Sequence, residues 1–407
     1  MRIRVANIVS PNFGSSYSGI THRLFSLLSG WQDDEITLDL FGTKIKPMNM
    51  SSGNLDYHLP QGAFWSKPKQ LDRKGRIKWS IDLLYLLYKR RMDYDIIHFH
   101  TLGWGALLSP ILLHLLGKKV VFTMSLMGND NPGYIRKQPR GKMQVSLLRQ
   151  FDGAIGISQA LVEDAMHHKI RNVEYLPNFL AIPQLEERVS KRQVVESRNK
   201  IRKKFEIPMP AKIILFIGSM IYRKGVDILV DSFIELSQKY PELYLVLVGP
   251  KSQKESSKID EIYVNNLQNK LNQKNLKKHV LWIGMVKEQS MLVEFYRAAD
   301  IFAFPTRNEG LGNVLIEASA AELPIVATLL PGITDEVVAD GISGFLVENE
   351  KTDQFIAAID KLLQDEFKQS EMGKAGRKIV LEKFSFESYC KKIKDFYLRI
   401  YYENTHQ

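Results

Sequence analysis

Short apolar runs alternate with amphipathic stretches along the chain. In the first half, the runs predict strands at 2–9, 36–41, 95–99, 119–124, 153–157 and 173–176. Apolar residues at helical spacing predict helices at 20–30, 77–92, 103–116, 142–149 and 158–168. This alternation is typical of an α/β domain with a doubly wound parallel sheet.

The second half repeats the same rhythm. Its predicted strands are 212–218, 243–249, 279–283, 300–304, 324–327 and 344–347. Its predicted helices are near 225–239, 257–274, 288–298, 311–322 and 353–365. We therefore expect a first domain at 1–182, a proline-containing linker with one helix at 183–211, a second domain at 212–385, and a terminal helix at 386–407 that packs back on the first domain.

Two domains of this class are expected to face one cleft, because ligands bind at the carboxyl ends of the strands in such sheets. The 407 residues are 44% hydrophobic and 25% charged, as in ordinary globular proteins. Cys390 is the single cysteine, which excludes an intramolecular disulfide. The first residues run directly into a strand, so we expect no signal peptide and a cytoplasmic protein. No apolar run reaches the length of a membrane span.

Positive charge is concentrated in the first half. Residues 1–180 hold 23 Lys and Arg against 14 Asp and Glu, in a chain of net charge +11. Six bases lie between Lys67 and Lys78, and Trp65 and Trp79 flank them. This pattern favours an anionic surface, either a membrane leaflet or a phosphate-bearing acceptor, while a solvated basic face remains an alternative. No recognised nucleic-acid motif is present, so we expect no nucleic-acid partner.

Residues 302–317 hold the strongest candidate chemistry. A buried strand opens onto a loop with Glu309, and a helix with Glu317 follows Gly310 and Gly312. A glycine-rich strand-to-helix turn exposes backbone N–H groups that suit a phosphate. Carboxylates near such a turn suit the hydroxyls of a nucleotide-sugar. An ordinary turn with two solvated glutamates is the alternative.

A second strand-to-helix turn carries cations. The predicted strand ends at Gly218, and Arg223 and Lys224 precede Gly225 at the start of the next helix. Cations there could neutralise a diphosphate, Arg as a fork and Lys as a point charge. A departing nucleoside diphosphate needs such stabilisation where no metal is present. The alternative is a surface turn with two solvated bases.

Other candidates are weaker. The loop that ends at Gly19 has small residues but lacks the dinucleotide fingerprint, which disfavours a nicotinamide or flavin enzyme. His98 and His100 are expected near the carboxyl end of a strand, where either a structural role or substrate contact is open. Asp93-Tyr-Asp95 precedes a strand rather than following one, and no His/Cys cluster has zinc spacing. We therefore expect no metal.

The combination of segments resembles the retaining glycosyltransferases of the GT-B architecture, specifically the large family 4 (glycosyl transferases group 1). The similar segments follow one another in the family's order and spacing over nearly the whole chain. They are the loop around Gly19 and the segments 94–100, 156–161, 176–179, 218–225, 246–249, 304–318, 323–328 and 341–347.

The resemblance implies that the second domain binds a UDP- or GDP-sugar and the first domain binds the acceptor. Glu317 would bind the ribose, Glu309 would contact the donor sugar, and Lys224 would bind the diphosphate; Glu309 and Lys224 are the implied catalytic residues. Further donor contacts are implied at Gly19, Gly218, Ser219, Arg223, Gly310, Leu311, Gly312 and Asn313. Enzymes of this family keep the anomeric configuration and need no metal or other cofactor.

Two positions depart from the family pattern. Ser219 stands where the family usually has an arginine, and Met127 stands where a histidine commonly contacts the sugar. Asp130, in the same segment as Met127, remains a possible substrate contact.

The resulting hypothesis is a retaining, metal-independent hexosyltransferase or N-acetylhexosaminyltransferase that acts on a surface-polysaccharide acceptor, lipid-linked, at the inner face of the cell membrane. A relative that makes a small soluble glycoside and a non-catalytic nucleotide-sugar-binding or partner subunit are the alternatives.

Overall fold

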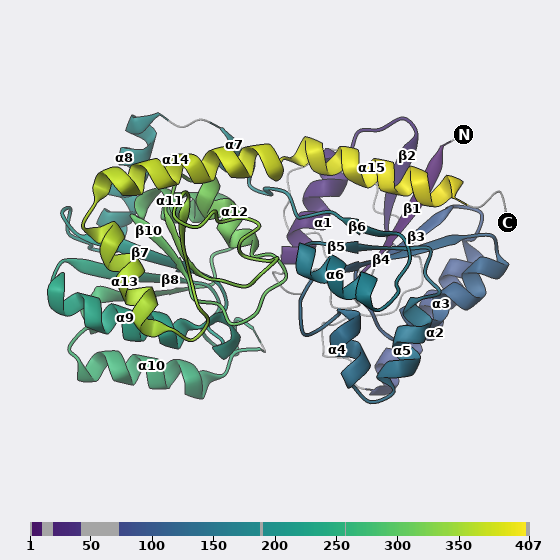
Figure 1. Ribbon diagram of the computed structural model, residues 1–407, viewed down its shortest axis with the longest axis horizontal. Helices are drawn as coiled ribbons and strands as arrows, with labels where there is room; N and C mark the ends of the chain where they lie inside the picture. Colours follow the sequence, from purple (N-terminus) through teal and green to yellow (C-terminus); the bar gives the residue numbers. More distant parts are fainter. Residues whose placement is uncertain (1, 10–18, 42–72, 188–189, 257, 404–407) are drawn as a thin grey trace. The chain divides into compact units, whose positions relative to one another are not determined.

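The computed structural model describes residues 2–9, 19–41, 73–187, 190–256 and 258–403 (Figure 1). It divides into two units. The first comprises residues 1–181 and 386–407, and the second comprises residues 182–385.

The first unit is a parallel six-stranded sheet in the order β2-β1-β3-β4-β5-β6. Its strands are β1 (Ile3–Ile8), β2 (Ile36–Phe41), β3 (Ile96–Phe99), β4 (Lys119–Met124), β5 (Gly153–Gly156) and β6 (Val173–Tyr175). Its helices are α1 (Gly19–Gly30), α2 (Arg73–Lys89), α3 (Trp104–Leu115), α4 (Pro132–Lys137), α5 (Gly141–Leu148), α6 (Gln159–His167) and α15 (Phe386–Tyr402).

Helix α15 completes the core of this first unit. Its residues Ile393 and Phe396 are buried in one apolar cluster with Leu24 and Leu27 of α1 and with Val5 of β1. Burial of such side chains stabilises a fold by roughly 1.5–3 kcal/mol each relative to their exposure. The last helix of the chain is therefore part of the first unit's core.

The second unit is a parallel six-stranded sheet in the order β12-β11-β10-β7-β8-β9. Its strands are β7 (Lys212–Ile217), β8 (Leu243–Val248), β9 (Val280–Gly284), β10 (Ile301–Phe304), β11 (Ile325–Thr328) and β12 (Gly344–Val347). Its α-helices are α7 (Pro183–Glu186), α8 (Lys191–Lys204), α9 (Val226–Lys239), α10 (Glu261–Gln273), α11 (Gln289–Ala298), α12 (Asn313–Ala320), α13 (Thr352–Leu363) and α14 (Glu366–Lys383).

The central strands of this sheet are buried on both faces, which explains their continuous apolar sequences. All six residues of β8 and all four of β10 are buried. Helices α11 and α12 lie on one side of these strands, and α9 and α10 lie on the other (Figure 1). The predicted α/β fold class with two doubly wound parallel sheets is confirmed.

Three elements differ from the sequence prediction. Residues 183–211, predicted as a linker with one helix, form α7 and α8 and belong to the second unit, where α8 packs against α11. Helices α4 and α14 were not predicted. Two glycines interrupt the apolar pattern of α14, and one of them, Gly373, permits close packing, because a Cβ there would lie 1.9 Å from the Glu322 carbonyl oxygen.

Candidate functional site

The carboxyl ends of β7 and β10 meet where the strand order of the second sheet reverses. These two strands are parallel neighbours, with Ile214 opposite Ile301, although 83 or more residues separate them in sequence. From β7 the chain continues to β8 on one side, and from β10 it continues to β11 on the other. Ligands of doubly wound sheets bind at such a reversal. The two turns predicted to carry chemistry therefore lie next to each other.

A carboxylate and two cations meet at this reversal of the strand order. The Glu309 carboxylate forms an ion pair with the Lys224 ammonium, and its Oε1 lies 3.2 Å from Arg223 Nη1. The Thr306 hydroxyl donates to the same oxygen at 3.3 Å. The side chains of Glu309 and Lys224 are only 10% and 15% exposed, whereas Arg223 is 33% exposed. The structure thus brings together three residues that the sequence placed in separate motifs.

Burial and neighbouring charges have opposite effects on the pKa values of Glu309 and Lys224. Burial alone would raise the pKa of the Glu309 carboxyl, but the charges of Lys224 and Arg223 outweigh it and lower that pKa. Burial lowers the pKa of Lys224, against the opposing attraction of Glu309. Glu309 is consequently an ionised, largely buried carboxylate at neutral pH.

Close backbone packing holds the two turns together. Gly225 has a φ of 69°, and a Cβ on it would lie 1.8 Å from the Pro305 carbonyl oxygen. Only glycine fits a position with both constraints. The Arg307 amide also donates to the Arg223 carbonyl at 2.8 Å.

Arg307 anchors the loop that carries Glu309, and it was not among the residues predicted from the sequence. Its guanidinium donates to both carboxylate oxygens of Asp227 at 2.8 and 2.7 Å, and to the Tyr222 carbonyl at 2.7 Å. It also pairs with Glu350 and lies over the Tyr222 ring. Bidentate pairing of this kind fixes orientation as well as charge. The one signal in the sequence was an arginine two residues before Glu309.

The predicted backbone contacts are distributed around the same turns. The Gly218 amide donates to the Val248 carbonyl at 2.9 Å, and Ser219 follows it, half-buried. Gly310 is buried, and Leu311 is 1% exposed, so the Leu311 side chain belongs to the core.

Helix α12 begins beside these residues. Gly312 caps it with a φ of 85°, and Asn313 is its first residue. The amino-terminal end of α12, with its positive dipole, therefore lies directly after the Glu309 loop.

Glu317 lies on α12 and contacts Tyr296 of α11. The Tyr296 hydroxyl donates to the Glu317 carboxyl at 2.6 Å. Burial raises the pKa of this carboxyl to about 7, and the Tyr296 hydrogen bond only partly opposes that rise. Glu317 therefore changes charge near neutral pH, unlike Glu309.

His98 of the first unit has a structural role. It is fully buried, with Nδ1 2.7 Å from the Tyr397 hydroxyl and Nε2 2.7 Å from the Thr123 hydroxyl. Burial, together with the nearby charge of Arg23, lowers the pKa of His98 to about 3. Both ring nitrogens are occupied, so the substrate contact left open by the sequence is not available to this residue.

The structure says less about the remaining predicted contact residues, which are His100, Asp130 and Gly19. His100 is 3% exposed; its Nε2 lies 2.9 Å from Asn7 Oδ1, and its Nδ1 has no partner among the described residues. Asp130 accepts hydrogen bonds from the Ser125 amide and hydroxyl and from the Leu126 amide, so its carboxylate organises its own loop. Gly19 is the first residue of α1, and the loop before it lies outside the described residues.

Two further predictions concern metals and membranes. Within the described ranges, no group of three or more His, Cys, Asp or Glu residues is placed to hold a metal ion. The described part of the chain has no helix of the length and apolarity needed to span a bilayer. The predicted basic stretch runs from Lys67 to Lys78. Residues 67–72 lie outside the described residues, and so do the side chains of residues 73–78.

Comparisons with known proteins show what the second unit is similar to. The sequence model of the family described as "Glycosyl transferases group 1" matches residues 197–379, which lie in the second unit and include both turns. A relative, the capsular polysaccharide biosynthesis glycosyltransferase CapM of Staphylococcus aureus, is 29% identical over 201 residues, which is 49% of this chain and 49% of that protein. The chain spans only 40 to 49% of the length of the first curated relatives that it matches.

Solved structures match over almost the entire chain. Sucrose-phosphate synthase from Thermosynechococcus elongatus has a TM-score of 0.76 at 18% identity and covers 99% of this chain and 100% of its own. HepE of Anabaena, in complex with UDP-glucose, has a TM-score of 0.73 at 16% identity and covers 98% and 100%. The chain has the two-domain GT-B fold, and its sequence is similar to glycosyltransferases.

Proposed function

We propose that this protein is a retaining glycosyltransferase that moves a hexose or N-acetylhexosamine from a UDP- or GDP-sugar to a lipid-linked surface-polysaccharide acceptor, without a metal ion. One observation carries the proposal: a buried carboxylate, Glu309, lies between Arg223 and Lys224 at the point where the second sheet reverses its order. The UDP-glucose complex of HepE supports a nucleotide-sugar donor, and the name of CapM supports a polysaccharide acceptor.

In this proposal each group has a defined task. Arg223 and Lys224 stabilise the negative charge that develops on the leaving diphosphate. Glu309 positions the donor sugar, and Glu317 binds the ribose hydroxyls. The bond between the anomeric carbon and the diphosphate oxygen breaks, the acceptor oxygen attacks from the same face, and its proton passes to the leaving phosphate oxygen. The anomeric configuration is retained, and no metal is needed to balance charge.

A panel of UDP- and GDP-sugars with EDTA present tests this function. The measurements are the thermal shift for donor binding and the slow release of UDP or GDP for turnover. A shift with one donor, and nucleotide release that Glu309→Gln abolishes, is the expected result. Glu371→Gln, in an exposed ion pair with Lys374 on α14, is the matched control and should behave as wild type.

A non-catalytic nucleotide-sugar-binding subunit is the second candidate. Ser219 in the turn after β7 and Met127 in the first unit favour it, because each replaces a charged or polar residue that the family usually has there. Binding of a donor, with no nucleotide release in the presence of any lipid-linked acceptor, would favour this candidate over the transferase.

We also propose that the protein acts at the inner membrane face through α2 and α3, which pack against each other. Ile81, Tyr85 and Tyr88 on α2 are exposed at spacings of four and three residues, and so are Leu108, Ile111 and Leu115 on α3. Exposed apolar stripes beside basic residues suit a lipid surface.

Flotation with anionic vesicles tests this location. Tyr85→Ser with Ile111→Ser should reduce the bound fraction severalfold, whereas Ile262→Ser, an exposed isoleucine on α10, should not. Equal binding of all three proteins would contradict a membrane role for these helices.

A further inference from the structure

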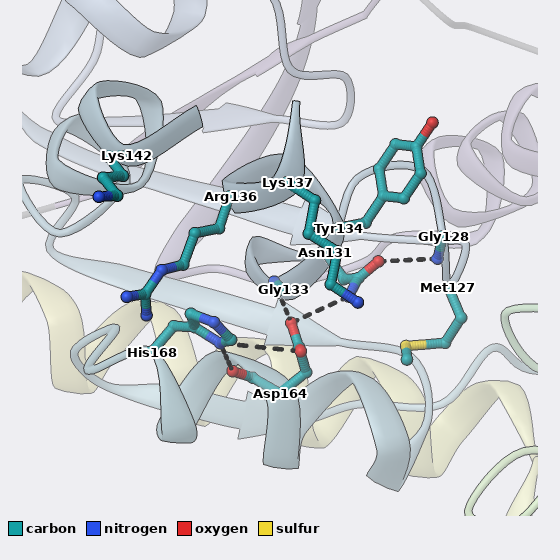
Figure 2. Close-up of a pocket in the computed structure, with 10 residues that line it drawn as sticks. All are labelled: Met127, Gly128, Asn131, Gly133, Tyr134, Arg136, Lys137, Lys142, Asp164 and His168. Atoms are coloured by element: carbon teal, nitrogen blue, oxygen red, sulfur yellow. Dashed lines mark hydrogen bonds and ion pairs between the residues drawn. The ribbon is translucent and has the colours of Figure 1, made fainter. Parts of the chain in front are cut away.

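A pocket of about 590 Å³ opens on the first unit, lined by α4, α5, α6 and the loop before α4 (Figure 2). Three cations line it: Arg136 and Lys137 from α4, and Lys142 from α5. Asp164 is the one acidic residue among the lining residues. Within the described part of the chain, no hydrogen bond or ion pair engages any of the three cations. The pocket thus collects positive charge that the surrounding residues leave unneutralised.

Asp164 is already committed to other groups. Its Oδ2 accepts from Asn131 Nδ2 at 3.0 Å and from the Gly133 amide at 2.8 Å (Figure 2). Its Oδ1 lies 3.7 Å from Nδ1 of His168. Two hydrogen bonds therefore engage Oδ2, and no ion pair joins the Asp164 carboxylate to Arg136, Lys137 or Lys142 among the described residues.

His168 supplies a buried polar atom to the same pocket. The residue is 8% exposed, and its Nδ1 donates to the Asp164 backbone carbonyl at 2.8 Å. The Nδ1 hydrogen bond to a carbonyl fixes the proton on that nitrogen. Nε2 has no partner among the residues that the structure describes; with the proton on Nδ1 it is a hydrogen-bond acceptor, which suits a hydroxyl group of a ligand in the pocket.

Two glycines allow close packing in the walls of the pocket. A Cβ on Gly133 would lie 2.2 Å from Asp164 Oδ1, and one on Gly141 would lie 2.1 Å from the Ile135 carbonyl oxygen. Both glycines therefore allow the α4–α5 turn to pack closely on its surroundings. The backbone that carries Arg136, Lys137 and Lys142 is therefore closely packed, while their side chains are exposed to solvent and accessible to a ligand.

We propose that this pocket binds a phosphate or diphosphate group of the acceptor. The inference rests on the proposed transferase function and names the substrate class for the first unit. Arg136 can hold phosphate oxygens as a fork, and Lys137 and Lys142 add point charges. Tyr134 and Met127, which also line the pocket, offer apolar surface to the sugar or prenyl group attached to that phosphate. A lipid-borne diphosphate and a soluble sugar phosphate share this chemistry.

Lysine protection measures binding at this pocket directly. The purified protein would be acetylated alone and with inorganic pyrophosphate, with geranylgeranyl diphosphate in detergent micelles, or with geranylgeraniol in the same micelles. Mass spectrometry would give the rate at each lysine. Lys391, exposed on α15 and outside the pocket, is the reference.

We expect acetylation of Lys137 and Lys142 to slow at least threefold with a phosphate probe, while Lys391 is unchanged. Protection by both phosphate probes would assign the site to phosphate itself, and protection by the lipid diphosphate alone would assign it to a lipid-borne phosphate. Unchanged rates with both phosphate probes, or equal protection by geranylgeraniol, would overturn the proposal.

Paired variants connect the pocket to transfer. Arg136→Gln with Lys142→Gln should raise the KM for a phosphorylated acceptor at least about tenfold and leave the KM for the donor unchanged. Lys391→Gln should change neither. Protection of Lys224 by pyrophosphate reports on the donor site in the same experiment, so failure of the pocket proposal is distinguishable from failure of the proposed function. An unchanged acceptor KM in the double variant would exclude the pocket from acceptor binding.

Discussion

The two sheets reverse their strand order at equivalent places, but the residues found there differ in kind. In the second unit, the reversal between β7 and β10 holds Glu309, Lys224 and the partly exposed Arg223. In the first unit, the reversal lies between β1 and β3, where His98 is fully buried between Tyr397 and Thr123. The comparison teaches that the two reversals share a topology and differ in their side chains: charged groups meet at the second, whereas both ring nitrogens of His98 are hydrogen-bonded at the first.

The sharpest test of this comparison removes the negative charge of Glu309, where the second sheet reverses its strand order. Glu309→Gln should lower the transfer rate at least about a thousandfold, because a neutral amide cannot balance the two cations or hold the donor sugar. Since the pair is largely buried, we also expect a loss of up to about 3 kcal/mol in the free energy of unfolding. Nucleotide release and urea denaturation measure the two effects. A variant with near-wild-type turnover would place the chemistry elsewhere.

Arg307→Gln tests whether activity requires a fixed position of the Glu309 loop in addition to the charge of Glu309. The substitution removes the bidentate contact with Asp227 and the contact with the Tyr222 carbonyl, so Glu309 loses its fixed position. We expect kcat/KM to fall by about a hundredfold, as for small displacements of catalytic groups. Arg307 acts through the loop, so Asp227→Asn combined with Arg307→Gln should cost little more than Arg307→Gln alone. Additive losses would show that the two residues act separately.

The Glu317 carboxyl changes its charge near neutral pH, whereas the Glu309 carboxyl is ionised there. Its pKa of about 7 means that the carboxyl is mostly protonated at pH 6 and mostly ionised at pH 8. If the ionised form accepts hydrogen bonds from the ribose, nucleotide affinity should rise about tenfold between these pH values. Calorimetry on wild type and Glu317→Gln checks this expectation. The variant should show a flatter pH dependence, and identical curves for both proteins would remove Glu317 from the ribose site.

Substitutions around His98, where the first sheet reverses its strand order, should lower the free energy of unfolding and leave activity almost unchanged. Tyr397→Phe removes one hydrogen bond to His98 and should cost about 1 kcal/mol, measured by urea denaturation. The pKa of His98 is lowered from 6.5 to about 3, so its contribution to stability is present above pH 6.5 and is lost as the pH falls toward 3. The kcat of Tyr397→Phe should stay within about twofold of wild type. A large loss of kcat with unchanged stability would give this network a catalytic role.

The sequence predicted the sheets and the two turns of the second unit because their signals are local. Strands β7 and β10 are short apolar runs that end at Ile217 and Phe304, and each is followed by a turn and a helix. Parallel strands of this pattern place their loops at one edge. The donor-side residues could therefore be proposed before any contact was known.

The remaining features depend on partners that are distant in the chain. Arg307 and Asp227 are 80 residues apart, and His98 and Tyr397 are 299 apart. No local pattern predicts that a histidine at a strand end has both ring nitrogens hydrogen-bonded, or that Arg307 anchors the start of α9, which lies far earlier in the chain. The pocket lined by Arg136 and Lys142 was missed for a related reason, because the short helix α4 carries too few residues for a periodic signal.

The place of α15 has a consequence for synthesis of the protein. Residues 1–181 leave the ribosome first, but their apolar core includes Ile393, Phe396 and Ile400 at the far end of the chain. The second unit, complete by residue 385, has all of its strands before the first unit receives its last helix. Part of the first unit's core therefore remains uncovered until α15 has been synthesised. A nascent chain stalled before residue 386 should bind chaperones through this surface, and its release should coincide with the emergence of the final helix.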